Sequence, residues 1–158
     1  MVHLICGKIC SGKTTYAKDL AGRLPGVILS CDELALLLFD GDLGAKHDEV
    51  LQKVRQYLLE KAIAVARAGA NVILDWGFWS EKDRREITAR FENAGIPVKW
   101  HYICVSEEIW QRNIQKRNAA VIDGTAMDYY VDAGLLHKMR KQFEEPDRES
   151  MDYWYTLG

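Results

Sequence analysis

Gly7-Lys8-Ile9-Cys10-Ser11-Gly12-Lys13-Thr14 is the stretch that decides the fold, because it matches G-x-x-x-x-G-K-[ST] at every fixed position. Glycines let a tight loop turn its backbone N–H groups toward phosphate oxygens, the lysine reaches the β and γ phosphates, and the hydroxyl holds Mg²⁺. A chance match in one chain is on the order of 1% or less. We therefore expect this loop, with Thr15, to bind a nucleotide and Thr14 to bind the metal. The alternative is a plain strand-to-helix turn.

The segments around this loop alternate between short apolar runs and helical patterns. Val2–Cys6 has the pattern of a buried strand, and the apolar spacing from Lys13 onward predicts a helix that ends at Pro25-Gly26. Val27–Leu29 and Val72–Leu74 predict the second and third strands, with a long amphipathic helix between them. Strands that alternate with helices predict an α/β fold: a parallel sheet covered on both faces, in a three-layer α/β/α sandwich.

The second half of the chain continues this alternation, and we expect residues 1–158 to form one domain. The further elements are predicted as a capped helix from Ser80 to Ala94, a strand over Val98–Val105, a helix from Ser106 to about Asn118, a helix over Met127–Glu144 and a last strand over Tyr153–Leu157. A Gly-rich break at residues 40–44 precedes the long amphipathic helix.

Two carboxylates follow two of the predicted strands, Asp32 after the second and Asp75 after the third. Ligands of parallel sheets gather at the carboxyl ends of the strands, where the phosphate loop also lies. We expect Asp32 to act in catalysis or in substrate or metal binding; otherwise it caps a helix that begins at Glu33. Asp75 is expected to face the ligand, either behind the metal or against the next loop, unless it is a structural cap.

Trp76-Gly77-Phe78-Trp79 follows Asp75 on a loop that leads from strand to helix. Burial of three large rings on such a loop would be unusual. Trp76 and Trp79 are therefore candidates to stack on a planar or apolar acceptor substrate. The alternative is that the rings fill a crevice beneath a neighbouring helix.

The arginines of interest form two groups. Arg112 and Arg117 precede a Gly-containing break at residues 118–126, within a predicted lid of about residues 112–130. Guanidinium groups neutralise the charge of a transferring phosphoryl group, so we expect at least one of them to be catalytic or to contact ATP. The alternative is ordinary ion pairs on a helix surface. The second group is expected to form a solvated face of the helix 80–94: Arg84, Arg85 and Arg90.

The composition argues against several classes of protein. Lys plus Arg total 21 and Asp plus Glu 23, for a net charge of −2, so a broad basic surface for nucleic acid or anionic lipid is not expected. No apolar run is long enough to cross a membrane and the N-terminus lacks a signal-peptide pattern, which predicts a cytoplasmic protein. The histidines show no metal-ligand spacing and the cysteines no disulfide framework.

The residues that accompany the loop favour a small-molecule kinase. Leu74-Asp75 lacks the second acidic residue of a ring ATPase, the sequence has no Asn-Lys-x-Asp motif of GTPases, and no Asp-x-x-Gly stretch follows a predicted strand as a GTPase switch would. The chain resembles the phosphate-loop kinase-like family of chloramphenicol phosphotransferase, zeta toxins and the kinase domain of polynucleotide kinase. The resemblance extends over nearly the whole chain, through the phosphate loop, Ser30-Cys31-Asp32, Val72-Ile73-Leu74-Asp75, Arg112 with Arg117, and Phe143-Glu144-Glu145-Pro146-Asp147.

This resemblance implies a five-stranded parallel sheet in the order 2-3-1-4-5, with ATP and Mg²⁺ as ligands. It also implies that the Asp after the second strand activates an acceptor hydroxyl, that arginines come from a lid, and that the Phe143 segment packs near the adenine. Polynucleotide kinases have an Arg three residues after that Asp, where this chain has Ala35. A polynucleotide 5′-hydroxyl is therefore a disfavoured acceptor.

We thus expect a kinase that transfers the γ-phosphoryl group of ATP to a hydroxyl of a small molecule. Lys13 and the loop amides would hold the phosphates, Asp32 would accept or orient the acceptor's proton, and Arg112 and Arg117 would screen charge in the transition state. Two alternatives stay open: a nucleotide-binding regulatory module that has no acceptor, and a kinase of a nucleoside, a nucleotide or a nucleic-acid end.

Overall fold

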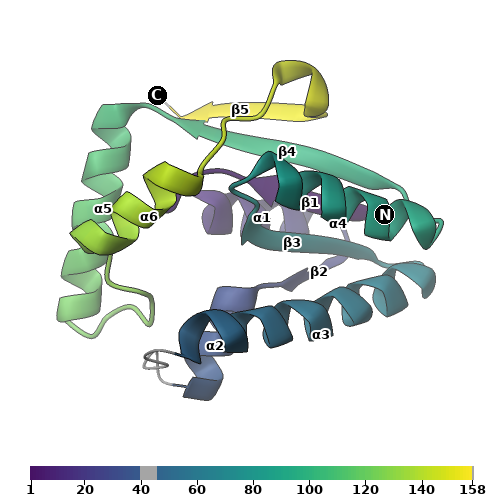
Figure 1. The fold of residues 1–158 in the computed structure, drawn as a ribbon, viewed down its shortest axis with the longest axis horizontal. Helices are drawn as coiled ribbons and strands as arrows, with labels where there is room; N and C mark the ends of the chain where they lie inside the picture. The colour runs from purple at the N-terminus through teal and green to yellow at the C-terminus, as the bar shows by residue number, and fades with distance from the viewer. Residues whose placement is uncertain (40–45, 158) are drawn as a thin grey trace.

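A five-stranded parallel sheet forms the centre of the computed structural model, which describes residues 1–39 and 46–157 (Figure 1). The strands are β1 (Val2–Cys6), β2 (Gly26–Leu29), β3 (Asn71–Gly77), β4 (Val98–Val105) and β5 (Tyr153–Leu157). Their order in space is β2-β3-β1-β4-β5, and every neighbouring pair is parallel. The predicted α/β class and the strand order are confirmed.

The alternation of side chains along β1 explains the layers on the two faces of the sheet. Leu4 faces one side, where it packs in a cluster with Ala62 of helix α3 (His47–Arg67) and Phe91 of helix α4 (Glu81–Asn93). Ile5 faces the other side and packs with Ala17 and Leu20 of helix α1 (Lys13–Arg23). All five residues of β1 are buried, as expected for a central strand.

Six helices surround this sheet in the described part of the chain. They are α1 (Lys13–Arg23), α2 (Cys31–Phe39), α3 (His47–Arg67), α4 (Glu81–Asn93), α5 (Glu107–Ile122) and α6 (Ala133–Gln142), and a 3₁₀ turn at Arg148–Ser150 precedes β5. Helices α5 and α6 lie side by side at the end of the sheet toward which the strand arrows point (Figure 1). This end also carries the loop between β1 and α1.

Two helices differ in extent from those predicted. Helix α5 continues past Asn118 to Ile122, because it ends only where Gly124 takes up a left-handed φ of 70°. The predicted helix over Met127–Glu144 is too long at both ends, since it begins at Ala133 and ends at Gln142. The backbone before it is held against α5 instead: the Asn118 side chain donates to the Val131 carbonyl at 2.9 Å and accepts from the Val131 N–H at 2.8 Å.

Two further predictions concern membrane spans and a Gly-rich break. Among the described residues no helix has the length and apolarity that a membrane span requires. The Gly-rich break predicted at residues 40–44 lies outside the described residues.

Candidate functional site

The loop between β1 and α1 is folded so tightly that its two fixed glycines are required. A Cβ on Gly7 would come within 2.8 Å of both the Ile103 carbonyl oxygen and Ser11 Oγ. Gly12 has a left-handed φ of 94° directly before α1 begins. The loop therefore leads into the N-terminus of a helix, where free N–H groups and the helix dipole favour an anion.

Lys13 crosses this loop and lies near both predicted carboxylates. Its Nζ donates to the Lys8 carbonyl oxygen at 2.6 Å. Burial lowers the pKa of Lys13, whereas the charges of Asp75 and Asp32 raise it. The structure thus brings together the lysine and the two carboxylates that the sequence predicted for the site.

Thr14 and Asp75 meet across the site and form a pair suited to a magnesium ion. Asp75 lies within β3 rather than after it, because β3 stays paired with the end of β1 as far as Gly77, whose carbonyl accepts from the Gly7 N–H at 3.1 Å. Thr14 Oγ1 donates to Asp75 Oδ2 at 2.7 Å. Asp75 is 6% exposed, and its Oδ1 has no hydrogen-bond partner among residues 1–39 and 46–157. Hydroxyl and carboxylate oxygens are ligands that Mg²⁺ accepts, so these residues fit the ion.

Asp32 lies in the first turn of α2, but it does not cap that helix. The Ser30 hydroxyl accepts the Glu33 N–H at 3.3 Å, which is the hydrogen bond that a cap residue makes. The Asp32 side chain remains accessible to water. Desolvation by the surrounding protein raises the pKa of Asp32, the charges of Asp75 and Asp128 add to this rise, and Lys13 opposes it. A carboxylate with a raised pKa is a better proton acceptor.

Of the two predicted arginines, the structure brings only Arg117 to the site. Its Nε lies 3.0 Å from Oδ2 of Asp128, a residue of the segment between α5 and α6, and its charge acts on the pKa of both Lys13 and Asp32. Arg112 lies on an exposed surface of α5, 3.9 Å from Glu108. Five residues along a helix correspond to a rotation of about 140°, so the two side chains point in different directions.

The predicted acceptor-binding tryptophans are engaged in packing. Trp76 is part of β3; its indole Nε1–H donates to the Leu29 carbonyl at 2.8 Å, and its ring stacks on Phe78. Trp79 packs in a cluster with Cys10 of the loop and Val131. These contacts correspond to the alternative of rings that fill a crevice, and contact with an acceptor stays a prediction for both tryptophans.

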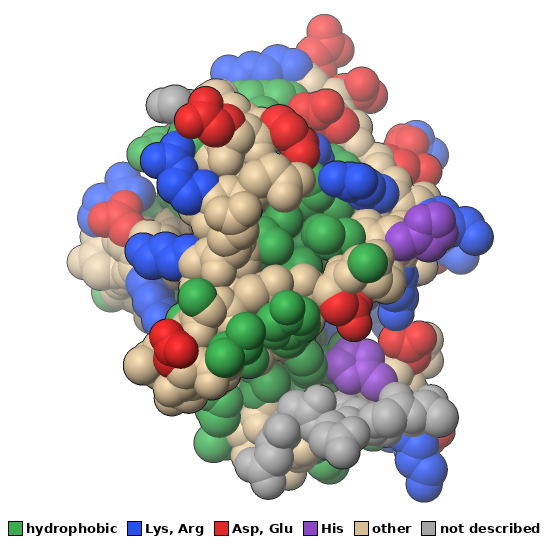
Figure 2. All heavy atoms as spheres, turned by 90° about the vertical axis from the view of Figure 1, so that its left-hand side faces the viewer, with side chains coloured by type: hydrophobic (Ala, Val, Ile, Leu, Met, Phe, Trp, Pro, Cys, Tyr) green, Lys and Arg blue, Asp and Glu red, His purple; other side chains and the backbone are tan. Residues whose placement is uncertain are grey.

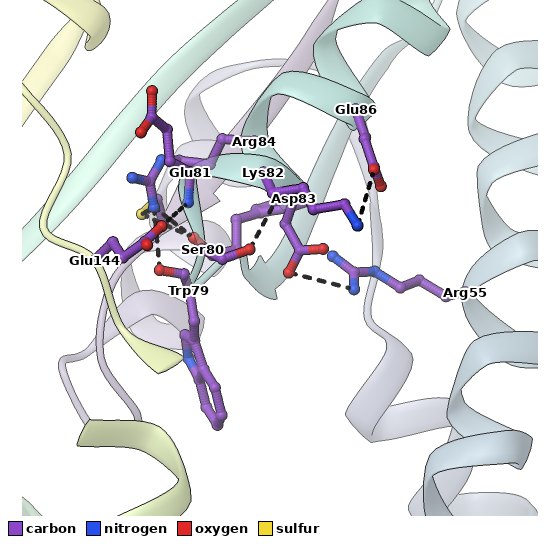
Figure 3. Close-up of polar contacts among 11 residues, drawn as sticks. Arg55, Trp79, Ser80, Glu81, Lys82, Asp83, Arg84, Glu86 and Glu144 are labelled. Carbon is purple, nitrogen blue, oxygen red and sulfur yellow. Dashed lines mark hydrogen bonds and ion pairs between the residues drawn. The ribbon is translucent and has the colours of Figure 1, made fainter. Parts of the chain in front are cut away.

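Arg84 was predicted on a solvated face and that prediction is wrong, because it is 7% exposed. Its Nη1 donates to the carbonyls of Phe78 at 3.0 Å and Trp79 at 3.2 Å, and a Glu144 carboxylate oxygen accepts the Glu81 N–H beside it (Figure 3). Arg84 precedes Ile87 and Phe91 by three and seven residues on the buried stripe of α4. This spacing is the signal in the sequence that could have revealed its burial.

Sequence reasoning also missed Asp128 and Tyr129 between α5 and α6. The charge of Asp32 contributes to a raised pKa of Tyr129, which burial brings to about 12, so the two residues are neighbours. Among the described residues, three buried side-chain oxygens lack a hydrogen-bond partner: Ser11 Oγ, Asp75 Oδ1 and Tyr129 Oη. All three belong to this site, and buried oxygens without a partner are groups that a bound ligand or ion can satisfy.

Comparison with solved structures shows the same fold in several other proteins. Chaetomium thermophilum Kti12 in complex with ADP-AlF3 has a TM-score of 0.71 and 18% identity, covering 100% of this chain and 89% of that chain. The Mycobacterium tuberculosis APS kinase CysC in complex with AMPPNP and APS has a TM-score of 0.65 and 18% identity, covering 98% and 87%. A gluconokinase from Sinorhizobium meliloti has a TM-score of 0.62 and 12% identity, covering 99% and 81%.

Comparison of sequences gives a family but no individual relative. No curated protein matches this chain. The sequence model of the AAA domain family matches residues 2–146, which include the phosphate loop, both carboxylates and α5. The match extends over most of the chain, and its strand order is that of the P-loop fold of the solved structures above. The chain therefore belongs to the AAA domain family.

Proposed function

We propose that this protein is a kinase that uses ATP and Mg²⁺ to phosphorylate a hydroxyl group of a small molecule. The observation that carries the proposal is the convergence of Lys13, Asp75, Asp32 and Arg117 around the phosphate loop. A module that only binds a nucleotide needs the loop and a metal ligand. It does not need a water-accessible carboxylate with a raised pKa beside them.

Each of these residues would have a separate part in the transfer. The loop amides and Lys13 would bind the β and γ phosphates, and Thr14 would hold Mg²⁺, with Asp75 behind it. The bound metal ion would screen the negative charge of the phosphates. The acceptor oxygen attacks the γ phosphorus, the bond to the bridging oxygen breaks, and ADP leaves with that electron pair. Asp32 takes the proton of the acceptor hydroxyl.

Arg117 would supply positive charge in the transition state. In the structure its guanidinium is paired with Asp128 at 3.0 Å, and the two side chains are 23% and 31% exposed. A partly buried guanidinium close to Lys13 is suited to the charge that spreads over a transferring phosphoryl group. We infer that Arg117 exchanges Asp128 for a phosphate oxygen when ATP binds.

Two observations favour a small acceptor over a nucleic-acid end. Ala35, which stands where polynucleotide kinases have an arginine, is fully buried at 0% exposure. The end of the molecule that carries the site shows Lys and Arg side chains mixed with Asp and Glu around an apolar area, rather than a continuous basic surface (Figure 2). Phosphate backbones are bound mainly by clustered positive charge.

The first experiment is calorimetry of ATP binding in the presence of Mg²⁺. The wild-type protein is expected to bind ATP, and Lys13→Ala is expected to lose most of the affinity because the phosphates lose their ammonium partner. Radiolabelled ATP, tested against pooled alcohols, sugars, nucleosides, antibiotics and a nucleic-acid 5′ end, then identifies the acceptor class. Folded protein that binds no ATP at millimolar concentration would end the proposal.

Asp32→Asn separates a kinase from a regulatory module. If Asp32 takes the proton, ATP affinity stays near that of the wild type while phosphoryl transfer falls by about 10² to 10⁴. The matched control is Glu33→Gln, which makes the same chemical change at an exposed neighbour in α2. Full transfer activity in Asp32→Asn would remove Asp32 from the reaction.

A further inference from the structure

Helix α5 holds the outer side of the phosphate loop by two hydrogen bonds that the proposed chemistry does not use. The indole Nε1–H of Trp110 donates to the Ile9 carbonyl oxygen at 2.7 Å. The side-chain amide of Asn113 donates to the Cys10 carbonyl oxygen at 3.0 Å. The donors are three residues apart on one face of α5, and the acceptors are consecutive residues of the loop.

The bond from Trp110 fixes the direction of the peptide unit between Ile9 and Cys10. None of the described peptide bonds is cis, so a carbonyl that points toward α5 places the N–H of the same peptide unit on the opposite side. That N–H belongs to Cys10 and faces away from α5. Backbone N–H groups on the inner side of such a loop are the donors that phosphate oxygens need.

The bond from Asn113 is made to a residue with an unfavourable backbone conformation. Cys10 has a φ of 57°, which is the left-handed region that residues other than glycine rarely adopt. Such a conformation persists only when the surrounding structure holds it. Here Cys10 is 8% exposed and packs in one cluster with Trp110 and Ile114 of α5.

We propose that Trp110 and Asn113 are positioning residues that hold the loop in its phosphate-binding conformation before ATP arrives. This inference rests on the proposed function, because it assigns a purpose to the loop geometry. Without the two donors the loop would populate other conformations. The apparent affinity for a ligand falls in proportion to the fraction of protein in the competent conformation.

The test compares Asn113→Ala and Trp110→Phe with the wild type by calorimetry with MgATP and with inorganic triphosphate. Triphosphate can contact only a phosphate-binding site, so it reports on the loop. Loss of one hydrogen bond is expected to raise both dissociation constants about tenfold, and amide exchange of residues 8–13 is expected to become faster. The matched control is Gln111→Ala on the same helix, since within residues 1–39 and 46–157 the Gln111 side chain bonds to Glu107 one turn earlier and to no residue of the loop.

A role limited to packing predicts a different result. In that case each substitution would lower the melting temperature. At a temperature where every variant is folded, both dissociation constants would stay at the wild-type value. That result in Asn113→Ala, with Lys13→Ala losing ATP binding, overturns the inference and leaves the proposed function intact. If Lys13→Ala also binds ATP normally, the proposed function fails and this inference fails with it. If Trp110→Phe does not fold, Asn113→Ala alone decides.

Discussion

Acid is expected to destabilise this protein through a buried histidine that lies away from the candidate site. His101 of β4 is 2% exposed, and its ring stacks on Tyr153 with centroids 4.5 Å apart. Its Nε2 lies 2.9 Å from Nδ1 of His3, and its Nδ1 lies 2.8 Å from the Tyr16 hydroxyl. Burial, reinforced by the charge of His3, lowers the pKa of His101 from 6.5 to about 4.

The size of the effect follows from the difference between the two pKa values. Above pH 6.5 His101 is neutral in the folded and the unfolded chain, so its full contribution to stability is present. As the pH falls from 6.5 toward 4, the unfolded chain takes up a proton that the folded chain does not, and the free energy of unfolding decreases. The whole shift corresponds to about 3 kcal/mol, of which about 2 kcal/mol is lost between pH 7 and pH 5.

Urea denaturation at pH 7 and pH 5 measures this loss. The His101→Phe variant keeps an aromatic ring in the stack and removes the imidazole of residue 101, while His3, whose pKa burial also lowers, remains in both proteins. Between pH 7 and pH 5 the free energy of unfolding of the variant should therefore fall by about 2 kcal/mol less than that of the wild type. His137→Phe, at an exposed histidine of α6, is the matched control and should follow the wild type. Equal loss of stability in the wild type and His101→Phe between the two pH values would show that His101 does not cause the acid sensitivity.

Three further predictions concern the site and its support. Thr14→Val should weaken ATP binding about tenfold when Mg²⁺ is present and much less in EDTA, as measured by calorimetry at several Mg²⁺ concentrations. An equal loss of affinity with Mg²⁺ and in EDTA would contradict a role of Thr14 in metal binding. Arg117→Met should lower kcat about 10³-fold, whereas Arg112→Met should leave kcat near the wild-type value. Equal steady-state rates of the two variants would exclude a role of Arg117 in the transition state. Arg84→Met should destabilise the fold by about 2 to 3 kcal/mol because two carbonyls lose their donor, whereas Arg85→Met, whose side chain is 79% exposed, should change stability by less than about 0.5 kcal/mol in the same urea assay.

The sheet and the phosphate loop could be predicted because their signals are local. Each buried strand is a short apolar run, and the two fixed glycines of the loop stand where a side chain would collide or where φ is left-handed. The positions of Asp32 and Asp75 followed from the rule that strand ends gather at one edge of a parallel sheet. The pairing of Arg117 with Asp128 could not be predicted from this rule, because it depends on where the segment after α5 folds back.

The errors arise where tertiary contacts override local periodicity. Residues from Met127 onward have helical spacing, yet Asn118 binds both backbone groups of Val131 and keeps that part of the chain out of a helix. Arg84 looks like a surface residue by its charge, but its guanidinium satisfies carbonyls of the turn before α4, and this compensates the cost of its burial. In both cases the deciding partner is a backbone group.

The kind of group that a side chain binds explains why the loop motif can be recognised in the sequence and the residues that support the loop cannot. A residue that contacts phosphate or metal must carry a particular chemical group. Few amino acids qualify at such a position, so the position forms part of a sequence motif. Trp110 and Asn113 bind backbone carbonyls 101 and 103 residues away, and every residue at those loop positions offers the same carbonyl. No pairing of side-chain types therefore marks the contact. Residues that set the direction of a peptide unit can be found only once the fold is known, and the competence of the phosphate loop depends on them as well as on the motif itself.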